Sequence, residues 1–153
     1  MRWQDFTIEQ LLVHRPPMLL LDEVVDYAED VLVARLTVPA SGRPGSADVP
    51  ALLCFEYMTQ AMAAHRGVAD RLAGAVPREA LVLGTREMVL EVEGLVAGAR
   101  LLVRVEAEVM LGQELCRYRC TVVDETTGFL VATADMKVFQ AADMDAFFRS
   151  TTP

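Results

Sequence analysis

The spacing of hydrophobic residues changes along the chain and divides it into predicted elements. Residues 49–65, VPALLCFEYMTQAMAAH, are apolar on nearly every side at helical spacing, a pattern typical of a helix buried by its surroundings. We therefore predict a long central helix over residues 49–67. Upstream, TIEQLL predicts a short helix with Thr7 as its N-cap, ended by Pro16 and Pro17, so that residues 1–17 form an N-terminal helix and a proline-rich entry.

A period of two replaces the helical spacing in most of the remaining chain. In LLVRVEAEV and in LCRYRCTVV, apolar residues alternate with charged or polar ones, as in strands buried on one face. DETTG has the composition of a hairpin turn, and Glu29–Asp30 marks another turn. The predicted strands lie within residues 18–28, 31–39, 80–92, 101–109, 115–123 and 128–140.

These elements fit one α+β domain spanning residues 1–153. A helix that is apolar all round needs cover on several sides, and a strongly twisted antiparallel sheet provides this by curling about it. A chain of this length buries enough apolar surface to fold as a single unit.

Charge and composition restrict the classes of partner. The formal net charge is −8 and the sequence pI is near 4.7, so neither a nucleic-acid backbone nor an anionic membrane attracts this chain. Small molecules or proteins are the expected partners. The N-terminal apolar runs are interrupted by HRPP, which excludes a signal-peptide core or a membrane span there and predicts a cytoplasmic protein.

The three cysteines predict no disulfide and no metal site. Cys116 and Cys120 fall in one predicted strand, which separates them by about 13 Å. Cys54 lies in the apolar helix, and no second group of Cys or His has metal-ligand spacing. We interpret all three as small buried hydrophobic residues.

Two motifs resemble a known enzyme family. LLVHRPPMLLLDEVV (11–25) resembles the opening motif of the 3-hydroxyacyl-(acyl-carrier-protein) dehydratases, and FEYMTQAMA (55–63) resembles their central-helix motif, a glutamate followed by an apolar pair and a glutamine. Together with LGTRE and the closing KVFQ, the chain is most similar to the ApeP-like branch, which is associated with aryl-polyene biosynthesis.

The resemblance implies a fold, a reaction and partners. The fold is the hot-dog fold, a curled antiparallel sheet wrapped around one long helix, whose sheet edges usually pair into dimers; a homodimer is therefore expected. The reaction is dehydration of 3-hydroxyacyl thioesters on acyl carrier protein to trans-2-enoyl thioesters, in fatty-acid-like, polyketide or aryl-polyene biosynthesis. No separate cofactor is expected, because the substrate carries phosphopantetheine.

Glu56 is a charged residue within the apolar central helix. Glu56, Thr59 and Gln60 stand at i, i+3 and i+4, so they form a narrow polar stripe that we expect to face a cavity. In the resembling family, an acid at this place helps the 3-hydroxyl to leave as water. We therefore predict Glu56 as the catalytic acid and Thr59 and Gln60 as substrate contacts; the alternative is a buried structural carboxyl. The helix start at Pro50–Ala51 is predicted to offer backbone N–H groups to the thioester carbonyl, as hot-dog enzymes do.

The family's catalytic histidine is missing from its usual loop. That loop is of Gly-His-Phe-Pro-Gly type, whereas this chain has SGRPGSADVP (41–50), with Gly42, Arg43 and Pro44 near the expected slot. His65 lies about 13 Å beyond Glu56 on the same helix and half a revolution round, so it cannot reach Glu56 within one chain; we predict a partly exposed residue at the helix end.

His14, from either subunit of a dimer, is the candidate for the base that helix geometry leaves within one chain, and dimer symmetry also leaves the partner's His65 open. The HRPPM motif is usually structural, so we predict a His14 ring more than about 5 Å from Glu56 and hydrogen-bonded to backbone, with Arg15 and Asp22 in a structural network. On this view, replacing His14 costs stability more than turnover.

Three functions stay open at this stage. A dehydratase yields an enoyl thioester, a hot-dog thioesterase uses Glu56 to activate water and yields a free acid, and a non-catalytic acyl-binding or partner subunit of a second hot-dog chain yields neither product. The missing loop histidine favours the last. Arg66, Arg71 and Arg78 are candidates for a phosphopantetheine phosphate or an acidic carrier-protein helix, although solvated surface charge is the default for each.

Overall fold

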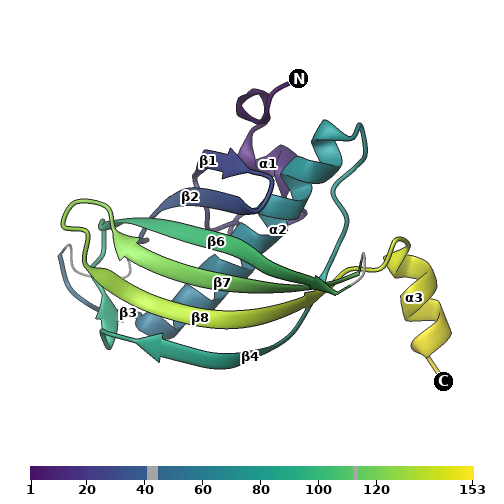
Figure 1. The fold of residues 1–153 in the computed structure, drawn as a ribbon. Helices are drawn as coiled ribbons and strands as arrows, with labels where there is room; N and C mark the ends of the chain where they lie inside the picture. The colour runs from purple at the N-terminus through teal and green to yellow at the C-terminus, as the bar shows by residue number, and fades with distance from the viewer. Residues whose placement is uncertain (41–44, 112–113) are drawn as a thin grey trace.

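The computed structural model describes residues 1–40, 45–111 and 114–153. Within these ranges, no helix is long and apolar enough to cross a membrane. Figure 1 shows the arrangement. The elements are η1 (Trp3–Asp5), α1 (Ile8–Leu11), β1 (Glu23–Ala28), β2 (Val31–Thr37), β3 (Val49–Pro50), η2 (Ala51–Leu53), α2 (Cys54–Leu72), β4 (Leu81–Leu90), β5 (Gly94–Leu95), β6 (Arg100–Leu111), β7 (Leu115–Asp124), β8 (Leu130–Phe139) and α3 (Met144–Thr151).

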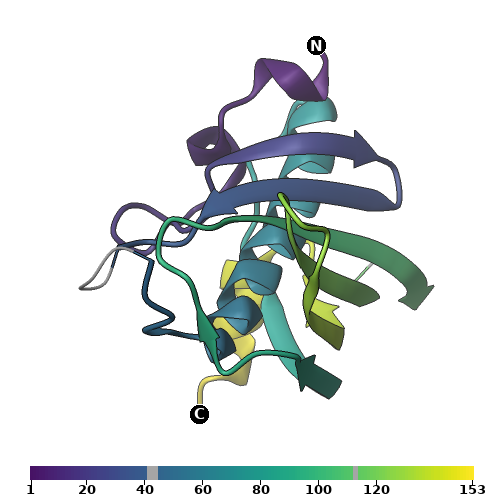
Figure 2. The same ribbon diagram turned by 90° about the vertical axis from the view of Figure 1, so that its left-hand side faces the viewer.

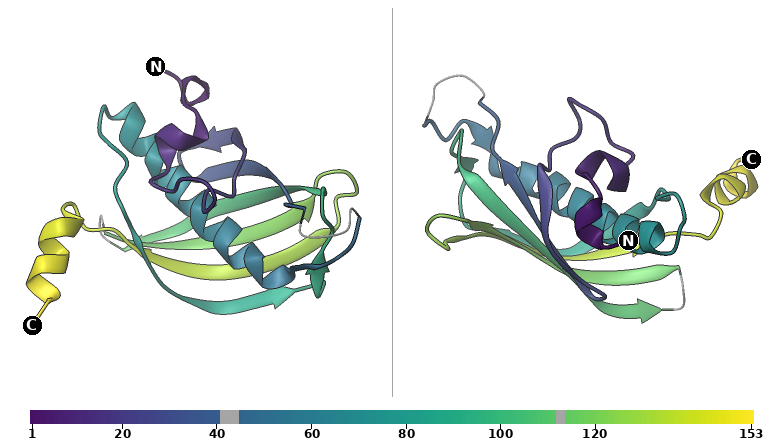
Figure 3. Two further views of the ribbon diagram at one scale, coloured as in Figure 1. Left: turned by 180° about the vertical axis from the view of Figure 1, so that it is seen from behind. Right: turned by 90° about the horizontal axis from the view of Figure 1, so that it is seen from above.

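Six strands form one antiparallel sheet in the order β1-β2-β6-β7-β8-β4. The chain leaves the first edge after β2, passes through α2, and re-enters at the opposite edge as β4 (Figures 1 and 2). The sheet curls around α2, which lies across its concave face (Figure 3). This is the hot-dog fold that the sequence predicted.

The core lies between α2 and the inner face of the sheet. On β2, Leu32, Ala34 and Leu36 are all completely buried, which confirms the predicted inward face of that strand. Along α2 the buried residues occupy most of the circumference, as expected for a helix covered on several sides. Burial of this apolar surface is the main source of stability for the fold.

The cysteines behave as the pattern predicted. All three are free and buried. Burial raises the pKa of Cys54 to about 11 and that of Cys120 to about 12, so both thiols stay protonated near neutral pH.

The central helix is shifted toward the C-terminus relative to the prediction. It begins at Cys54 instead of Val49 and continues to Leu72, whereas we expected its end near Gly67. Gly67 is a site of close packing: a Cβ there would lie 2.2 Å from the carbonyl oxygen of Leu11. The helix ends instead just before Gly74, whose φ of +77° suits glycine.

Three elements at the edges of the fold were not predicted. β3 and β5 form a separate two-stranded pair, and α3 follows β8 and projects from the body of the molecule (Figure 1). α3 is anchored by Phe147, whose ring centroid lies 5.0 Å from that of Phe139.

Candidate active site

The polar stripe of α2 is organised by Gln60, which is completely buried. Its Nε2 donates to the Glu56 Oε1 at 2.9 Å and to the Met18 carbonyl oxygen at 2.7 Å, and its Oε1 accepts from the Leu20 backbone N–H at 2.9 Å. Gln60 thus ties the entry segment to α2 and fixes one oxygen of Glu56. Because its amide is used by the protein itself, we assign Gln60 a positioning role in place of the predicted substrate contact.

His14 lies beside Glu56. The His14 Nε2 is 3.9 Å from the Glu56 Oε1, so the prediction of more than about 5 Å is wrong. The predicted backbone bond is also wrong, because the His14 Nδ1 is buried and has no hydrogen-bond partner among the described residues. Gln60 donates to the Met18 carbonyl oxygen and accepts from the Leu20 N–H, and these bonds hold the segment after His14 on α2, which brings His14 close to Glu56.

The pair is close without being hydrogen-bonded. A separation of 3.9 Å exceeds the hydrogen-bond range. The two side chains form an ion pair when the imidazole is protonated. Both side chains are partly accessible, 26% for His14 and 32% for Glu56, so a ligand can reach them. This geometry leaves each group available to act on a substrate atom.

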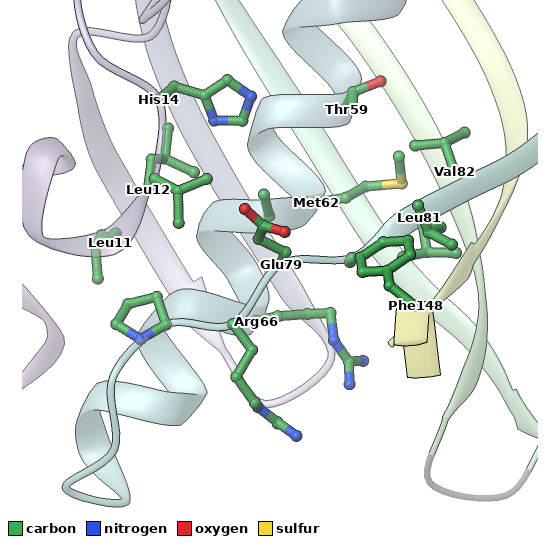
Figure 4. Close-up of a pocket in the computed structure, with 16 residues that line it drawn as sticks. Leu11, Leu12, His14, Thr59, Met62, Arg66, Glu79, Leu81, Val82 and Phe148 are labelled. Carbon is green, nitrogen blue, oxygen red and sulfur yellow. The ribbon is translucent and has the colours of Figure 1, made fainter. Parts of the chain in front are cut away.

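A cavity of about 210 Å³ extends from His14 along α2 (Figure 4). Thr59, Met62, Ala63 and Arg66 line it from one helix face, at i, i+3, i+4 and i+7. Its remaining walls are mostly apolar and come from α1 and the two residues after it, the loop before β4, the start of β4, β8 and α3; Arg78 and Glu79 of that loop are the charged residues among them. The Thr59 hydroxyl donates to the Phe55 carbonyl oxygen at 2.8 Å and keeps acceptor capacity for a ligand.

Within the described ranges, no three His, Cys, Asp or Glu side chains gather closely enough to hold a metal ion.

The start of the central helix differs from the prediction. Pro50 pairs with Gly94 in the β3·β5 ladder, and the Ala51 backbone N–H donates to the Glu93 carbonyl oxygen at 3.2 Å. The Ala51 N–H is therefore engaged, and the prediction that it is free for a thioester carbonyl is wrong. The first turn is the 3-10 helix η2, because β3 leads directly into it.

His65 is buried, not partly exposed as we predicted. It lies in the interior of α2 because the helix continues past Gly67 to Leu72. Its Nδ1 is 2.8 Å from the Tyr118 hydroxyl and its Nε2 is 3.0 Å from the Glu29 carbonyl oxygen. Burial lowers the pKa of His65, so this ring is a neutral part of the core.

The remaining predicted polar residues have other partners. Arg15 and Asp22 are both exposed, so the expected buried network does not form; Arg15 instead donates to the Leu12 and His14 carbonyl oxygens at 2.8 and 2.7 Å. Gly42, Arg43 and Pro44, at the slot of the family's loop histidine, lie outside the described residues.

The fold and the cavity define a hot-dog protein in which a histidine at the end of an apolar cavity lies beside a carboxylic acid. Residues 6–149 match the model of the ApeP-like family, described as ApeP dehydratase. The chain therefore belongs to the ApeP-like family of dehydratases, which are hydro-lyases. Comparison with curated proteins gave no match.

Solved structures share the fold. The chain is similar to the dehydratase heterocomplex ApeI:P from Xenorhabdus doucetiae, with a TM-score of 0.82, 17% identity, and coverage of 96% of this chain and 99% of that one. The PaaI protein of the E. coli phenylacetic acid degradation operon gives a TM-score of 0.56, 18% identity and coverage of 76% and 81%. A hypothetical thioesterase with coenzyme A from Streptococcus pneumoniae gives a TM-score of 0.54 and 14% identity, with coverage of 76% of this chain and 83% of that one. These similarities concern the hot-dog fold.

Proposed function

We propose that this chain dehydrates 3-hydroxyacyl thioesters carried on acyl carrier protein to trans-2-enoyl thioesters. The observation that carries the proposal is that His14, which lines one end of an apolar cavity, lies 3.9 Å from Glu56 in a chain of a dehydratase family. The cavity suits an acyl chain, and the two side chains are a base and an acid of the kinds that general acid–base catalysis uses.

In the proposed reaction, neutral His14 removes a proton from the carbon next to the thioester carbonyl. The electron pair of that C–H bond forms the carbon–carbon double bond, and the bond from the β-carbon to the hydroxyl oxygen breaks. Protonated Glu56 gives its proton to the departing oxygen, which leaves as water. Transfer of the proton from His14 to Glu56 then restores both groups.

The separation of His14 and Glu56 suits their separate roles as base and acid. A hydrogen bond between His14 and Glu56 would occupy the lone pair and the proton that the reaction needs, whereas a gap of 3.9 Å admits substrate atoms between them after a small displacement. Gln60 holds one Glu56 oxygen at 2.9 Å and so orients the other.

We further propose that the chain works as part of an assembly, either a homodimer or a pair with a second hot-dog subunit. β4 is an edge strand of the sheet and exposes Leu83, Val89 and Leu90, which an isolated chain leaves in water. The similarity to a dehydratase heterocomplex supports the second arrangement. Sedimentation at micromolar concentration tests this proposal. It would be contradicted if the chain sediments only as a 16.8 kDa monomer, both by itself and when mixed with each hot-dog partner tried.

Two other functions are kept because specific observations favour them. Similarity to a heterocomplex also fits a non-catalytic partner subunit, and similarity to a hypothetical thioesterase fits hydrolysis of the thioester. Dehydration produces an enoyl thioester, hydrolysis produces free acid and thiol, and a non-catalytic subunit produces neither.

The test is product analysis on a 3-hydroxyacyl acyl carrier protein, with the protein alone and with a second hot-dog subunit. We expect an enoyl thioester from wild type and from Glu9→Gln, a surface carboxylate control. The Glu56→Gln variant should give none under the same conditions. Free thiol without enoyl product would favour the thioesterase, and an enoyl product that is unaffected by Glu56→Gln would show that the partner subunit does the chemistry.

A further inference from the structure

Arg66 continues the row of α2 residues that begins at Glu56. Glu56, Thr59, Ala63 and Arg66 follow one another at steps of three and four residues, so they lie along one helix face. Ten residues of α-helix separate Glu56 from Arg66, a rise of about 15 Å. In Figure 4, His14 and Arg66 lie at opposite ends of the cavity lining, with Met62 between them.

Arg66 also borders a second cavity, of about 590 Å³, on its other side. His65, Tyr118 and Gln140 line that cavity and are all buried. Arg66 therefore stands between two cavities, and its guanidinium is half-buried between them.

A directional hydrogen-bond chain lines the second cavity next to Arg66. The Glu29 carbonyl can only accept, so the neutral His65 ring carries its proton on Nε2 and its Nδ1 accepts from the Tyr118 hydroxyl. The charge of Arg66 offsets part of the rise in the Tyr118 pKa that burial causes.

Gln140 holds the other side of the guanidinium. Its Oε1 accepts from the Arg66 Nε, and its Nε2 donates to the carbonyl oxygens of Arg78 and Glu79 at 3.0 and 3.3 Å. The amide orientation is therefore fixed by its two backbone partners. The Gln140 amide is neutral, so it positions the Arg66 guanidinium without balancing its charge.

No carboxylate forms an ion pair with Arg66 anywhere in the described part of the chain, although the protein carries a net charge of −8. Arg78, in the same cavity wall, is different because its Nη2 lies 2.8 Å from the Asp70 Oδ1. Glu79 also lines the first cavity without pairing with Arg66. A half-buried guanidinium without a counter-ion is costly, and a ligand that brings the missing negative charge relieves that cost.

We propose that Arg66, about 15 Å along the α2 axis from residue 56, is the receptor for an anionic oxygen group of the substrate. This inference rests on the proposed function and names a second contact for the same substrate. Two sources supply such a group: the phosphate of the phosphopantetheine arm, or a carboxylate at the far end of the acyl chain. A guanidinium binds either through paired N–H donors.

The distance fits the phosphate source. The arm has about thirteen bonds between phosphorus and sulfur, the length of roughly four extended residues or about 15 Å. An acyl chain that ends in a carboxylate and runs in the opposite direction reaches the same point. A methyl-terminated chain of that length would displace water from Arg66 without forming a hydrogen bond to it.

The test measures binding by calorimetry with two matched ligand pairs. The first pair is phosphopantetheine and pantetheine. The second consists of acyl-pantetheine analogues with an amide in place of the thioester, one ending in a carboxylate and one in a methyl group, so that no ligand can react. The proteins are wild type, Arg66→Gln, Arg66→Lys and the control Arg71→Gln, whose Nε donates to the Gln10 carbonyl oxygen.

We expect wild type to prefer the anionic member of one pair, and Arg66→Gln to bind that member about 10- to 100-fold more weakly while the neutral member is unaffected. Arg66→Lys should recover part of the loss and Arg71→Gln should show none. The pair that responds identifies the source.

Equal binding of both members of both pairs by wild type would overturn the inference, and this outcome does not depend on whether a variant folds. An equal loss for anionic and neutral members would overturn it too. If the protein binds the anionic ligand through Arg66 but makes no enoyl thioester, the result would support this inference and contradict the proposed function.

Discussion

The carbonyl oxygen of Leu11 lies 2.2 Å from the point where a Cβ on Gly67 would stand. α1 therefore packs directly on the backbone of α2, an approach that only glycine allows. Leu11 is three residues before His14, so this contact also sets where the entry segment begins its path toward Glu56.

Replacing Gly67 with alanine should lower both stability and turnover. The new Cβ must displace backbone, which costs about 1–3 kcal/mol as overpacking does, and the displaced segment carries His14. Urea unfolding and an enoyl-thioester assay measure the two effects. Ala69→Ser, on an exposed position of the same helix, is the control and should change neither much. An unaltered Gly67→Ala protein would show that α1 is not held at this point.

Gln60→Leu tests the link between the entry segment and the acid. Leucine keeps the bulk but leaves the Leu20 N–H and the Met18 carbonyl without their side-chain partner, at roughly 1 kcal/mol for each lost hydrogen bond. Turnover should fall and its pH profile should shift, because Glu56 also loses a donor. Gln4→Leu on the exposed N-terminal turn is the comparison. A loss of stability with an unchanged pH profile would limit Gln60 to a structural role.

His14→Gln and Glu56→Gln should each lower kcat by about 10²–10⁴-fold, and the double variant should lose little more than the worse single variant. The melting temperature should stay near that of wild type. The His14 ring has no hydrogen bond to lose among the described residues, and a glutamine at position 56 can still accept from Gln60. This reverses our expectation from the sequence that His14 matters mainly for stability. Independent, multiplying losses would show that the two residues do not act on one step.

What the sequence predicted well was local. The inward face of β2 follows from alternation, and the stripe of Glu56, Thr59 and Gln60 follows from helical spacing, so both were visible without the fold. The place of His14 was not visible, because it depends on hydrogen bonds between Gln60 and residues about forty positions earlier.

Glycine caused the other main error. Gly67 was interpreted as a helix end, but glycine serves equally where another backbone approaches, and no local signal separates the two uses. Once α2 is extended to Leu72, His65 becomes an interior residue and its burial follows. The contact that explains Gly67 comes from Leu11 of the short helix α1, which lies more than fifty residues earlier in the sequence, so no local pattern shows it.

The burial of His65 predicts how stability depends on pH. Burial lowers the pKa of this ring from its ordinary value of 6.5, because a charged imidazole cannot be solvated beside Tyr118. The unfolded chain takes up a proton near pH 6.5, whereas the folded chain does so only at lower pH. The stability that the neutral ring contributes is therefore complete above about pH 6.5 and is lost as the pH falls toward the folded pKa, with a slope of at most about 1.4 kcal/mol per pH unit. Urea unfolding at a series of pH values should show a shallower slope below pH 6.5 in His65→Gln than in wild type. Gly67→Ala, which is destabilised elsewhere and keeps His65, should retain the wild-type slope, and equal slopes in all three proteins would show that His65 is not the titrating group.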